Sequence, residues 1–166
     1  MAELAAWPSL HGEDVTWEGA AIPACPCEGL RLFRVKFAGD GTQGARTLGL
    51  PGCGHATPTA LAIGPNDWLL MHPQADADAA ASAVAAAAGY AIEVSDALIV
   101  LALGDASPIM SRLTGLDVAC FSPGRTASMR LAGLAVVLAG LETGGVRMIF
   151  DRSYARHMSR YLELAA

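Results

Sequence analysis

Four residues in two short segments have the chemistry of a zinc site. Cys25 and Cys27 lie in "CPC", and Cys53 and His55 lie in "CGH". Three thiolates and one imidazole suit tetrahedral Zn²⁺, but both pairs are more closely spaced than the two to four intervening residues that are usual in structural zinc sites. Two other interpretations stay open: cysteines that bind nothing in two loops, or a redox pair.

The remaining polar residues predict no catalytic group. The sequence has no GxSxG, HExxH, Walker or Rossmann motif, and we expect no helix after the glycine-rich "GDGTQG", so a phosphate-binding loop is not predicted. The other histidines have no Ser, Cys or carboxylate at a triad spacing; they are His11, His72 and His157. Four aspartates lie beside turn residues, which predicts capping roles; they are Asp96, Asp105, Asp117 and Asp151.

The composition indicates one domain with apolar surface to spare. Of 166 residues, 53% are hydrophobic and 16% charged, and the mean hydropathy is +0.38. Alanine in helices accounts for much of this excess, and the rest suggests a surface that a partner covers. The net charge of −5 and the single lysine, Lys36, argue against nucleic-acid binding.

Neither a membrane span nor a secretion signal is predicted. No apolar segment approaches the roughly 20 residues that a span needs, and residues 1–15 lack a basic region followed by an apolar one. We therefore expect a cytoplasmic protein whose cysteines are reduced.

The hydrophobic pattern predicts an arm followed by a single α+β domain. Residues 1–29 form an irregular, extended arm and residues 30–166 form the domain. We expect a mainly antiparallel sheet with helices on one face. Strands are predicted over 30–39, 60–71 with a turn at 64–67, 91–103 with a bulge at 95–96, 124–142 and 145–151; helices are predicted over 76–89, 107–115 and 152–166.

Several residues carry these assignments. Asp76 or Asp78 can cap the helix over 76–89, and Gly89 is expected to end it. Trp68 is interpreted as a core anchor. The last helix has an apolar stripe at helical spacing, formed by Tyr154, Met158, Tyr161, Leu162 and Ala165.

Five motifs occur in the same order as in a known family. They are "GPNDWLL", "SDAL", "LD", "FSPGR" and "DRSYA". With these motifs, residues 60–166 resemble the gamma subunit of heterotetrameric sarcosine oxidase. The order of the five carries the resemblance, which does not include the arm or the cysteine-containing loops.

The resemblance implies a fold like the folate-binding domain of the glycine-cleavage aminomethyltransferase. It implies partners as well: large alpha and beta subunits that carry FAD, FMN, NAD and tetrahydrofolate, and a small zinc-binding delta subunit. Such a complex oxidises sarcosine and passes the one-carbon unit to folate. In that family the gamma subunit carries neither the flavins nor the folate, so no cofactor is expected in this chain.

One departure concerns the folate chemistry itself. The aminomethyltransferases have a Gly-Gly-Ile-x-Asp-Asp-type stretch on the strand that is written here "AGLAVVLAG". The acidic pair aligns near Val136 and Val137, which can neither hydrogen-bond a pterin nor act as a base. Two valines suit a buried sheet face instead.

We therefore expect a non-catalytic structural subunit of a heterotetrameric, flavin-dependent amine oxidase complex in sarcosine catabolism and one-carbon metabolism. Trp7 and Trp17 of the arm are candidate contacts, because tryptophan is enriched at interface hot spots. The alternatives are a stand-alone folate-binding or one-carbon-transfer protein of the same fold, and a small zinc-binding interaction module. The sequence leaves open which N-methylated amine is oxidised and whether the isolated chain self-associates.

Overall fold

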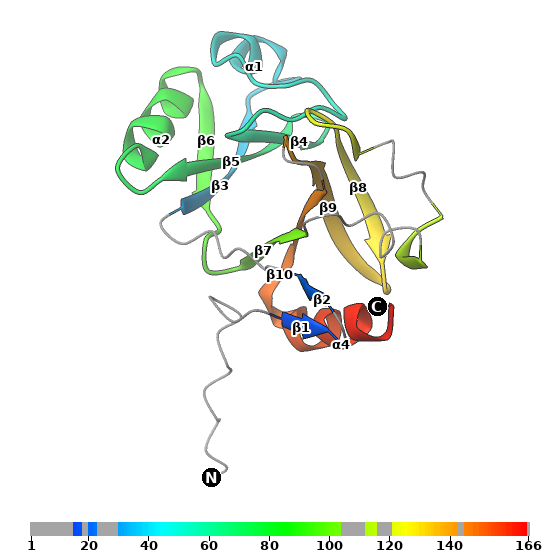
Figure 1. Cartoon of the computed structure of the whole chain (residues 1–166). Coiled ribbons are helices and arrows are strands. Elements are labelled where there is room, and N and C mark those ends of the chain that lie inside the picture. Colours follow the sequence, from blue (N-terminus) through cyan, green and yellow to red (C-terminus); the bar gives the residue numbers. More distant parts are fainter. Residues whose placement is uncertain are drawn as a thin grey trace.

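Two antiparallel sheets packed face to face form the body of the molecule in the computed structural model (Figure 1). The structure describes residues 15–17, 20–22, 30–103, 112–115, 121–142 and 145–165. The first sheet has the order β4-β5-β3-β6 and the second the order β7-β10-β9-β8. The strands are β3 Leu30–Phe37, β4 Ala60–Gly64, β5 Asp67–Pro73, β6 Gly89–Glu93, β7 Leu98–Leu103, β8 Thr126–Leu131, β9 Leu134–Gly140 and β10 Val146–Asp151.

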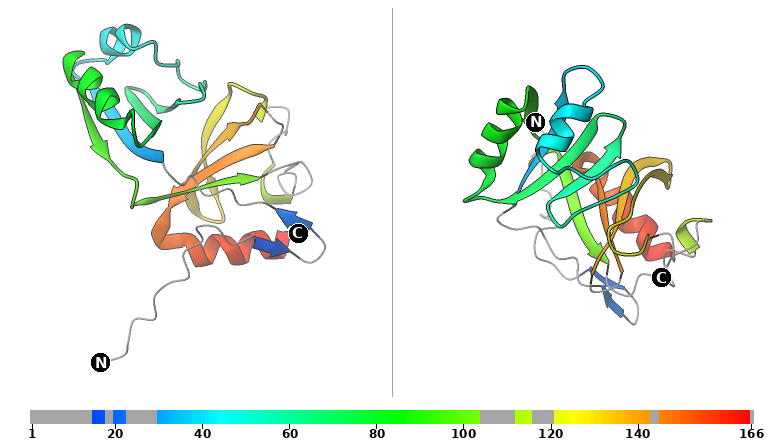
Figure 2. Two further views of the ribbon diagram at one scale, coloured as in Figure 1. Left: turned by 60° about the vertical axis from the view of Figure 1, so that its left-hand side comes forward. Right: turned by 90° about the horizontal axis from the view of Figure 1, so that it is seen from above.

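A helix covers the outer side of each sheet, so the layers are helix, sheet, sheet and helix (Figure 2). Helix α2 (Ala77–Ala86) lies on the first sheet, where Ala77 and Val84 meet its aromatic residues. Helix α4 (Ala155–Ala165) lies on the second sheet through Met158 and Leu162. The α+β class and the antiparallel pairing are confirmed, whereas the expectation of one sheet with its helices on one face is wrong.

The chain changes sheets where a single bulged strand was predicted. Residues 89–103 form β6 in the first sheet and β7 in the second. The break falls at the predicted place: the Ser95 hydroxyl accepts a hydrogen bond from the Leu32 N–H (2.9 Å) and donates one to Glu93 (3.0 Å). Ser95 thus fastens the connection to β3 while the chain crosses to the other layer.

The C-terminal end of α2 differs from the prediction in which residue has the left-handed backbone conformation. Ala88, not Gly89, takes the left-handed backbone conformation after the helix, with φ of 58°. Gly89 is required for space, because a Cβ there would lie 2.6 Å from Cδ1 of Phe37 and 2.9 Å from Cγ1 of Val84. At the other end, Asp76 occupies the N-cap but its side chain makes no capping hydrogen bond.

The strand predicted over 124–142 is two strands. β8 and β9 form a hairpin whose turn residues, Ala132 and Gly133, have φ of 51° and 80°. Two positive φ angles match the twist of a two-residue hairpin. β10 pairs antiparallel with β9, as expected, and also with β7. Residues 143–144, between β9 and β10, lie outside the described residues.

Three further elements test the remaining predictions. A short helix, α1 (Thr42–Thr47), begins inside the glycine-rich stretch, so the expectation that no helix opens there is wrong. Ala45 of α1 belongs to the same core cluster as Phe37. In the terminal helical segment Met158 and Leu162 are buried as predicted, but Tyr154, in the short 3₁₀ helix η2 (Arg152–Tyr154), is 47% exposed.

The predicted arm contains a hairpin of β1 (Val15–Trp17) and β2 (Ala20–Ile22). The helix predicted over 107–115 lies outside the described residues except for 112–115.

Candidate interaction surface

The turn between β4 and β5 makes side-chain hydrogen bonds to β3 and to the loop that precedes β4. Asn66 has φ of 49°, and its side-chain amide both accepts from the Phe37 N–H (3.0 Å) and donates to the Phe37 carbonyl (2.9 Å). Asp67 turns towards β3, and Trp68 enters the core with its indole N–H donating to the Pro51 carbonyl (2.8 Å). The hairpin turn and the core position of Trp68 are confirmed.

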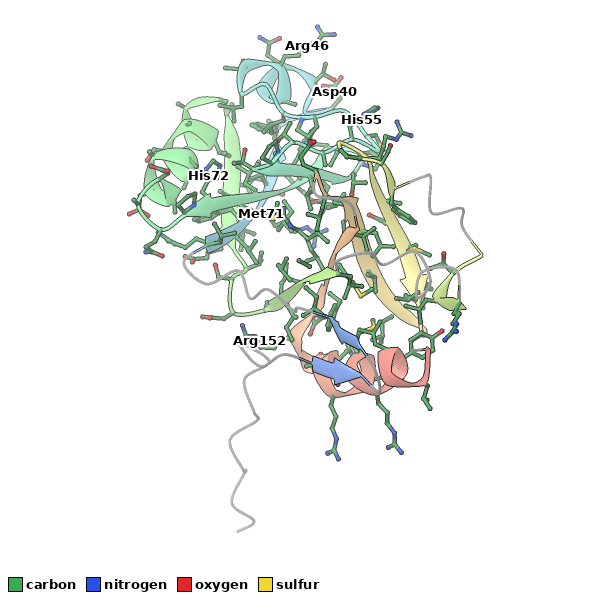
Figure 3. The ribbon with its side chains drawn as sticks, viewed as in Figure 1. Asp40, Arg46, His55, Met71, His72 and Arg152 are labelled. Carbon is green, nitrogen blue, oxygen red and sulfur yellow. The ribbon has the colours of Figure 1, made fainter. Side chains whose placement is uncertain are left out.

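The inner face of the first sheet is buried by the second sheet over one part only. Here the residues are Leu32, Leu61, Leu69 and Met71, each at most 4% exposed. They meet Val100, Ala139 and Ile149 of the second sheet. Met71 lies in this layer in Figure 3, and its sulfur accepts a 3.5 Å contact from Nη1 of Arg147.

The same face continues beyond the second sheet as a surface that we name the β6 platform, formed by Arg34, Lys36, Tyr90 and Ile92. Arg34 is the register partner of Ile92, and Lys36 is the partner of Tyr90, so each pair points to one side of the sheet. Arg34 also pairs with Leu69, which faces the second sheet. Tyr90 is 54% exposed and Ile92 57% exposed.

Asp67 holds the two cations of the platform in place. Its carboxylate accepts two hydrogen bonds from Arg34, at 2.9 and 2.6 Å, and lies 3.4 Å from the Lys36 ammonium. Burial alone would raise the pKa of Asp67, but the hydrogen bonds and charges of Arg34 and Lys36 outweigh burial and lower it below its ordinary value. Asp67 is therefore ionised at neutral pH and is an anchor rather than a proton donor.

A second ionic cluster lies on the opposite face of the same sheet. Arg31 donates two hydrogen bonds to Glu93 (2.9 and 2.6 Å) and one to Asp78 of α2 (2.6 Å). Hydrogen bonds from Arg31 and Ser95 lower the pKa of Glu93. Asp78 therefore ties α2 to the sheet instead of capping the helix, and this cluster has a structural role.

The structure tests only part of the zinc proposal. Cys25 and Cys27 lie outside the described residues. Cys53 is exposed, and Nε2 of His55 accepts a hydrogen bond from Nη1 of Arg125 (3.2 Å), since a guanidinium can only donate. Within the described parts of the chain, no group of three His, Cys, Asp or Glu side chains is placed to hold a metal. Zinc binding stays a prediction.

The remaining candidate residues that the structure describes lie at a helix cap, beside a backbone carbonyl, near a strand end or in an exposed turn. Asp151 caps η2, its carboxylate accepting from the Ser153 N–H (2.8 Å) and hydroxyl (2.6 Å), which confirms the predicted capping role. His157 lies 3.2 Å from the Ala132 carbonyl, and His72 is half-buried near the end of β5. Asp96 is exposed in the turn after β6. His11, Asp105 and Asp117 lie outside the described residues.

The two valines aligned with the acidic pair point to opposite sides of β9. Val136 is 2% exposed in the core beneath α4, and Val137 packs against the apolar layer between the sheets. Both positions have the apolar environment that the sequence predicted. A carboxylate at Val136 would have to be buried among aliphatic side chains.

The β6 platform is not predicted by the sequence alone. Its signal is present: Tyr90 and Ile92 alternate along a strand, and Arg34 and Lys36 alternate along another. The pattern alone cannot tell whether such a face is covered, because both a core and an interface use the same alternation.

These observations define an α+β domain of two stacked antiparallel sheets, with an apolar and basic surface left open beside them. Among the described residues, no helix is both long and apolar enough to cross a membrane. No protein-family model matches the sequence, and no curated protein matches it in a sequence search.

Among solved structures, a similar fold occurs in heterotetrameric sarcosine oxidase from Corynebacterium sp. U-96, whose structure is in complex with pyrrole 2-carboxylate. The match has a TM-score of 0.69 and 20% sequence identity, and it covers 87% of this chain and 83% of the other. The chain therefore shares its fold with a component of that enzyme. Because the two coverages are nearly equal, the two chains have similar lengths.

Proposed function

We propose that this chain is the gamma subunit of a heterotetrameric, sarcosine oxidase-like complex, in which it is a structural rather than a catalytic component. The observation that carries the proposal is the shared fold over 87% of this chain and 83% of the matched one. A component of similar length and fold is expected to occupy the same place in its own complex. The ordered motifs from "GPNDWLL" to "DRSYA" support the same subunit independently of the fold.

The proposed role is to hold larger subunits in register by burying surface against them. Its partners would be alpha and beta subunits that carry FAD, FMN, NAD and tetrahydrofolate, together with a delta subunit, in the cytoplasm. The apolar surroundings of Val136 and Val137 support a chain that leaves the folate to a partner.

Purification of the tagged full-length chain from its native host tests this proposal. We expect a yellow complex with flavin absorption bands, in which mass spectrometry identifies two larger chains as subunits of an amine oxidase. The control is an unrelated tagged domain purified in the same way. A colourless protein that elutes alone would contradict the proposal.

Two titrations separate the alternatives. If the isolated chain bound tetrahydrofolate at micromolar concentration in a calorimeter, a stand-alone folate-binding protein would replace the structural subunit. Metal analysis of protein produced in zinc-supplemented medium tests the set Cys25, Cys27, Cys53 and His55. One zinc per chain would favour the interaction module, and a substoichiometric amount would end that idea.

A further inference from the structure

The β6 platform brings exposed apolar side chains together on one strand. Among the described residues, the exposed large hydrophobic side chains are Tyr90, Ile92, Tyr154 and Leu164. Tyr154 lies on η2, which follows β10 of the second sheet, and Leu164 lies on α4, which covers the outer side of that sheet (Figures 1 and 2). Tyr90 and Ile92 are two residues apart on β6, so their side chains point to the same side and form one patch.

The platform also has one positive charge in excess. Arg34 and Lys36 share a single carboxylate, that of Asp67. Arg34 already makes two hydrogen bonds with Asp67, whereas Lys36 makes only a 3.4 Å contact and its side chain is 38% exposed. Lys36 is the only lysine in a chain of net charge −5. An additional carboxylate beside Lys36 would balance this local charge.

The free edge of β6 leaves room for a partner beside the patch. β6 pairs with β3 on one side, and its other side pairs with no strand in the described part of the chain. Its sequence, GYAIE, lacks the proline or lysine that commonly protects an edge, and its register with β3 contains no bulge. A partner can therefore approach both the face and the edge at the same place.

We propose that the β6 platform is the surface on which a flavin-carrying partner subunit docks, through a segment that sets an apolar side chain on Tyr90 and Ile92 and a carboxylate beside Lys36. This inference rests on the proposed function. Tyrosine at the centre of such a contact combines large apolar area with a polar end, as is common at hot spots. The basic rim selects an acidic segment of the partner and speeds its association.

The test measures the capture of flavin-carrying chains by the tagged full-length protein. Two variants address the platform: the double substitution Tyr90→Ser with Ile92→Ser, and Lys36→Glu. We expect the double variant to weaken the association about tenfold or more. Lys36→Glu is expected to weaken it about tenfold, and the loss should be largest at low ionic strength, where an ion pair is least screened.

Two matched variants serve as controls. Leu164→Ser removes an apolar side chain on α4 that is 83% exposed, more than those of Tyr90 and Ile92, and this variant should capture as much flavin as the wild type. Lys36→Arg keeps the charge and should also behave as the wild type. Thermal melting of each variant checks that the fold is intact, which is expected for the serine variants because Tyr90, Ile92 and Leu164 are each more than half exposed.

The outcomes distinguish the inference from the proposed function. If the wild type captures the flavin-carrying chains and both platform variants capture as much, the docking surface lies elsewhere and the inference is wrong, while the proposed function stands. If the wild type captures none, the proposed function is wrong and the inference is lost with it. If light scattering shows a dimer of the isolated chain that the platform variants dissociate, the occupant is a second copy and the inference is overturned.

Discussion

The inner face of the first sheet has two halves that differ in what lies above them. In the covered half, Leu61 and Met71 are at most 2% exposed beneath the second sheet. In the open half, Tyr90 and Ile92 on β6, at the other edge of the same sheet, are more than half exposed. Both halves belong to one antiparallel sheet in which side chains alternate between the two faces. The position of the second sheet therefore decides which side chains of this face are buried and which are exposed.

This difference shows how one sheet can serve both folding and association. The covered half consists of leucine side chains and Met71, an apolar set that suits a permanent layer between two sheets. The open half mixes aromatic, aliphatic and basic side chains, as interfaces do. The role that we propose, a structural subunit of a larger complex, requires a surface of the second kind.

The largest expected effect is a difference in the free energy of unfolding between a substitution in the covered half and one in the open half. Leu61→Ala removes a side chain that is 0% exposed between the sheets, so it should lower the free energy of unfolding by about 2–5 kcal/mol. Ile92→Ala, in the open half, should change it by no more than about 0.5 kcal/mol. Urea unfolding measures both. Equal losses would mean that Ile92 is packed as tightly as Leu61, and the comparison would fail.

The next effect concerns how β6, which bears the platform, is attached to α2. Gly89→Ala should lower the free energy of unfolding by about 1–3 kcal/mol, because the new methyl group would overlap Phe37 and Val84. The neighbouring Ala88→Gly is the matched control. Ala88 has φ of 58°, so glycine there should be neutral or stabilise by up to about 1 kcal/mol. If both substitutions destabilised equally, the close approach at Gly89 would not be the cause.

The third effect lies at the boundary of the halves, where Asp67 anchors Arg34 and Lys36. Asp67→Asn removes the charge but keeps the size, and it should lower the free energy of unfolding by about 1 kcal/mol at pH 7. The value is modest because the Arg34 side chain is 53% exposed. Asp96→Asn, which alters an exposed turn carboxylate, should have no effect beyond about 0.5 kcal/mol. No loss in Asp67→Asn would show that the ion pairs add nothing to the fold.

Much of the local structure could be predicted from the sequence. The alternation of Phe33, Val35 and Phe37 with Arg34 and Lys36 marks β3 as a half-buried strand, and the Gly-Pro-Asn-Asp turn marks the β4–β5 hairpin. These features depend on neighbours along the chain or on a single turn. Short segments of the sequence are therefore enough to predict them.

The arrangement of the sheets could not be predicted in the same way. The break at residues 94–97 reads as a bend, because a period of two is unchanged when the chain passes from one sheet to another. The β8–β9 turn was missed because alanine, as at Ala132, seldom adopts a positive φ. The exposure of Tyr90 and Ile92 depends on how far the second sheet extends over the first. The local sequence pattern does not predict that extent.

The smallest expected effect is a pH dependence that sharpens the role of Asp67. Its pKa is lowered in the folded chain by Arg34 and Lys36, so the unfolded chain binds the proton more readily. The stability that this carboxylate contributes is present above its ordinary pKa, and it is lost as the pH falls below about 4. The difference in unfolding free energy between the wild type and Asp67→Asn should therefore shrink between pH 4 and pH 2.

The reason is that a protonated aspartate, like asparagine, offers Arg34 only a neutral acceptor. Urea unfolding of both proteins at a series of pH values measures the difference directly. If it stayed constant down to pH 2, the carboxylate would have to remain ionised throughout or contribute by its shape alone. Repeating the series at high salt distinguishes these two cases, because salt screens the charges of this partly exposed group and leaves its packing unchanged.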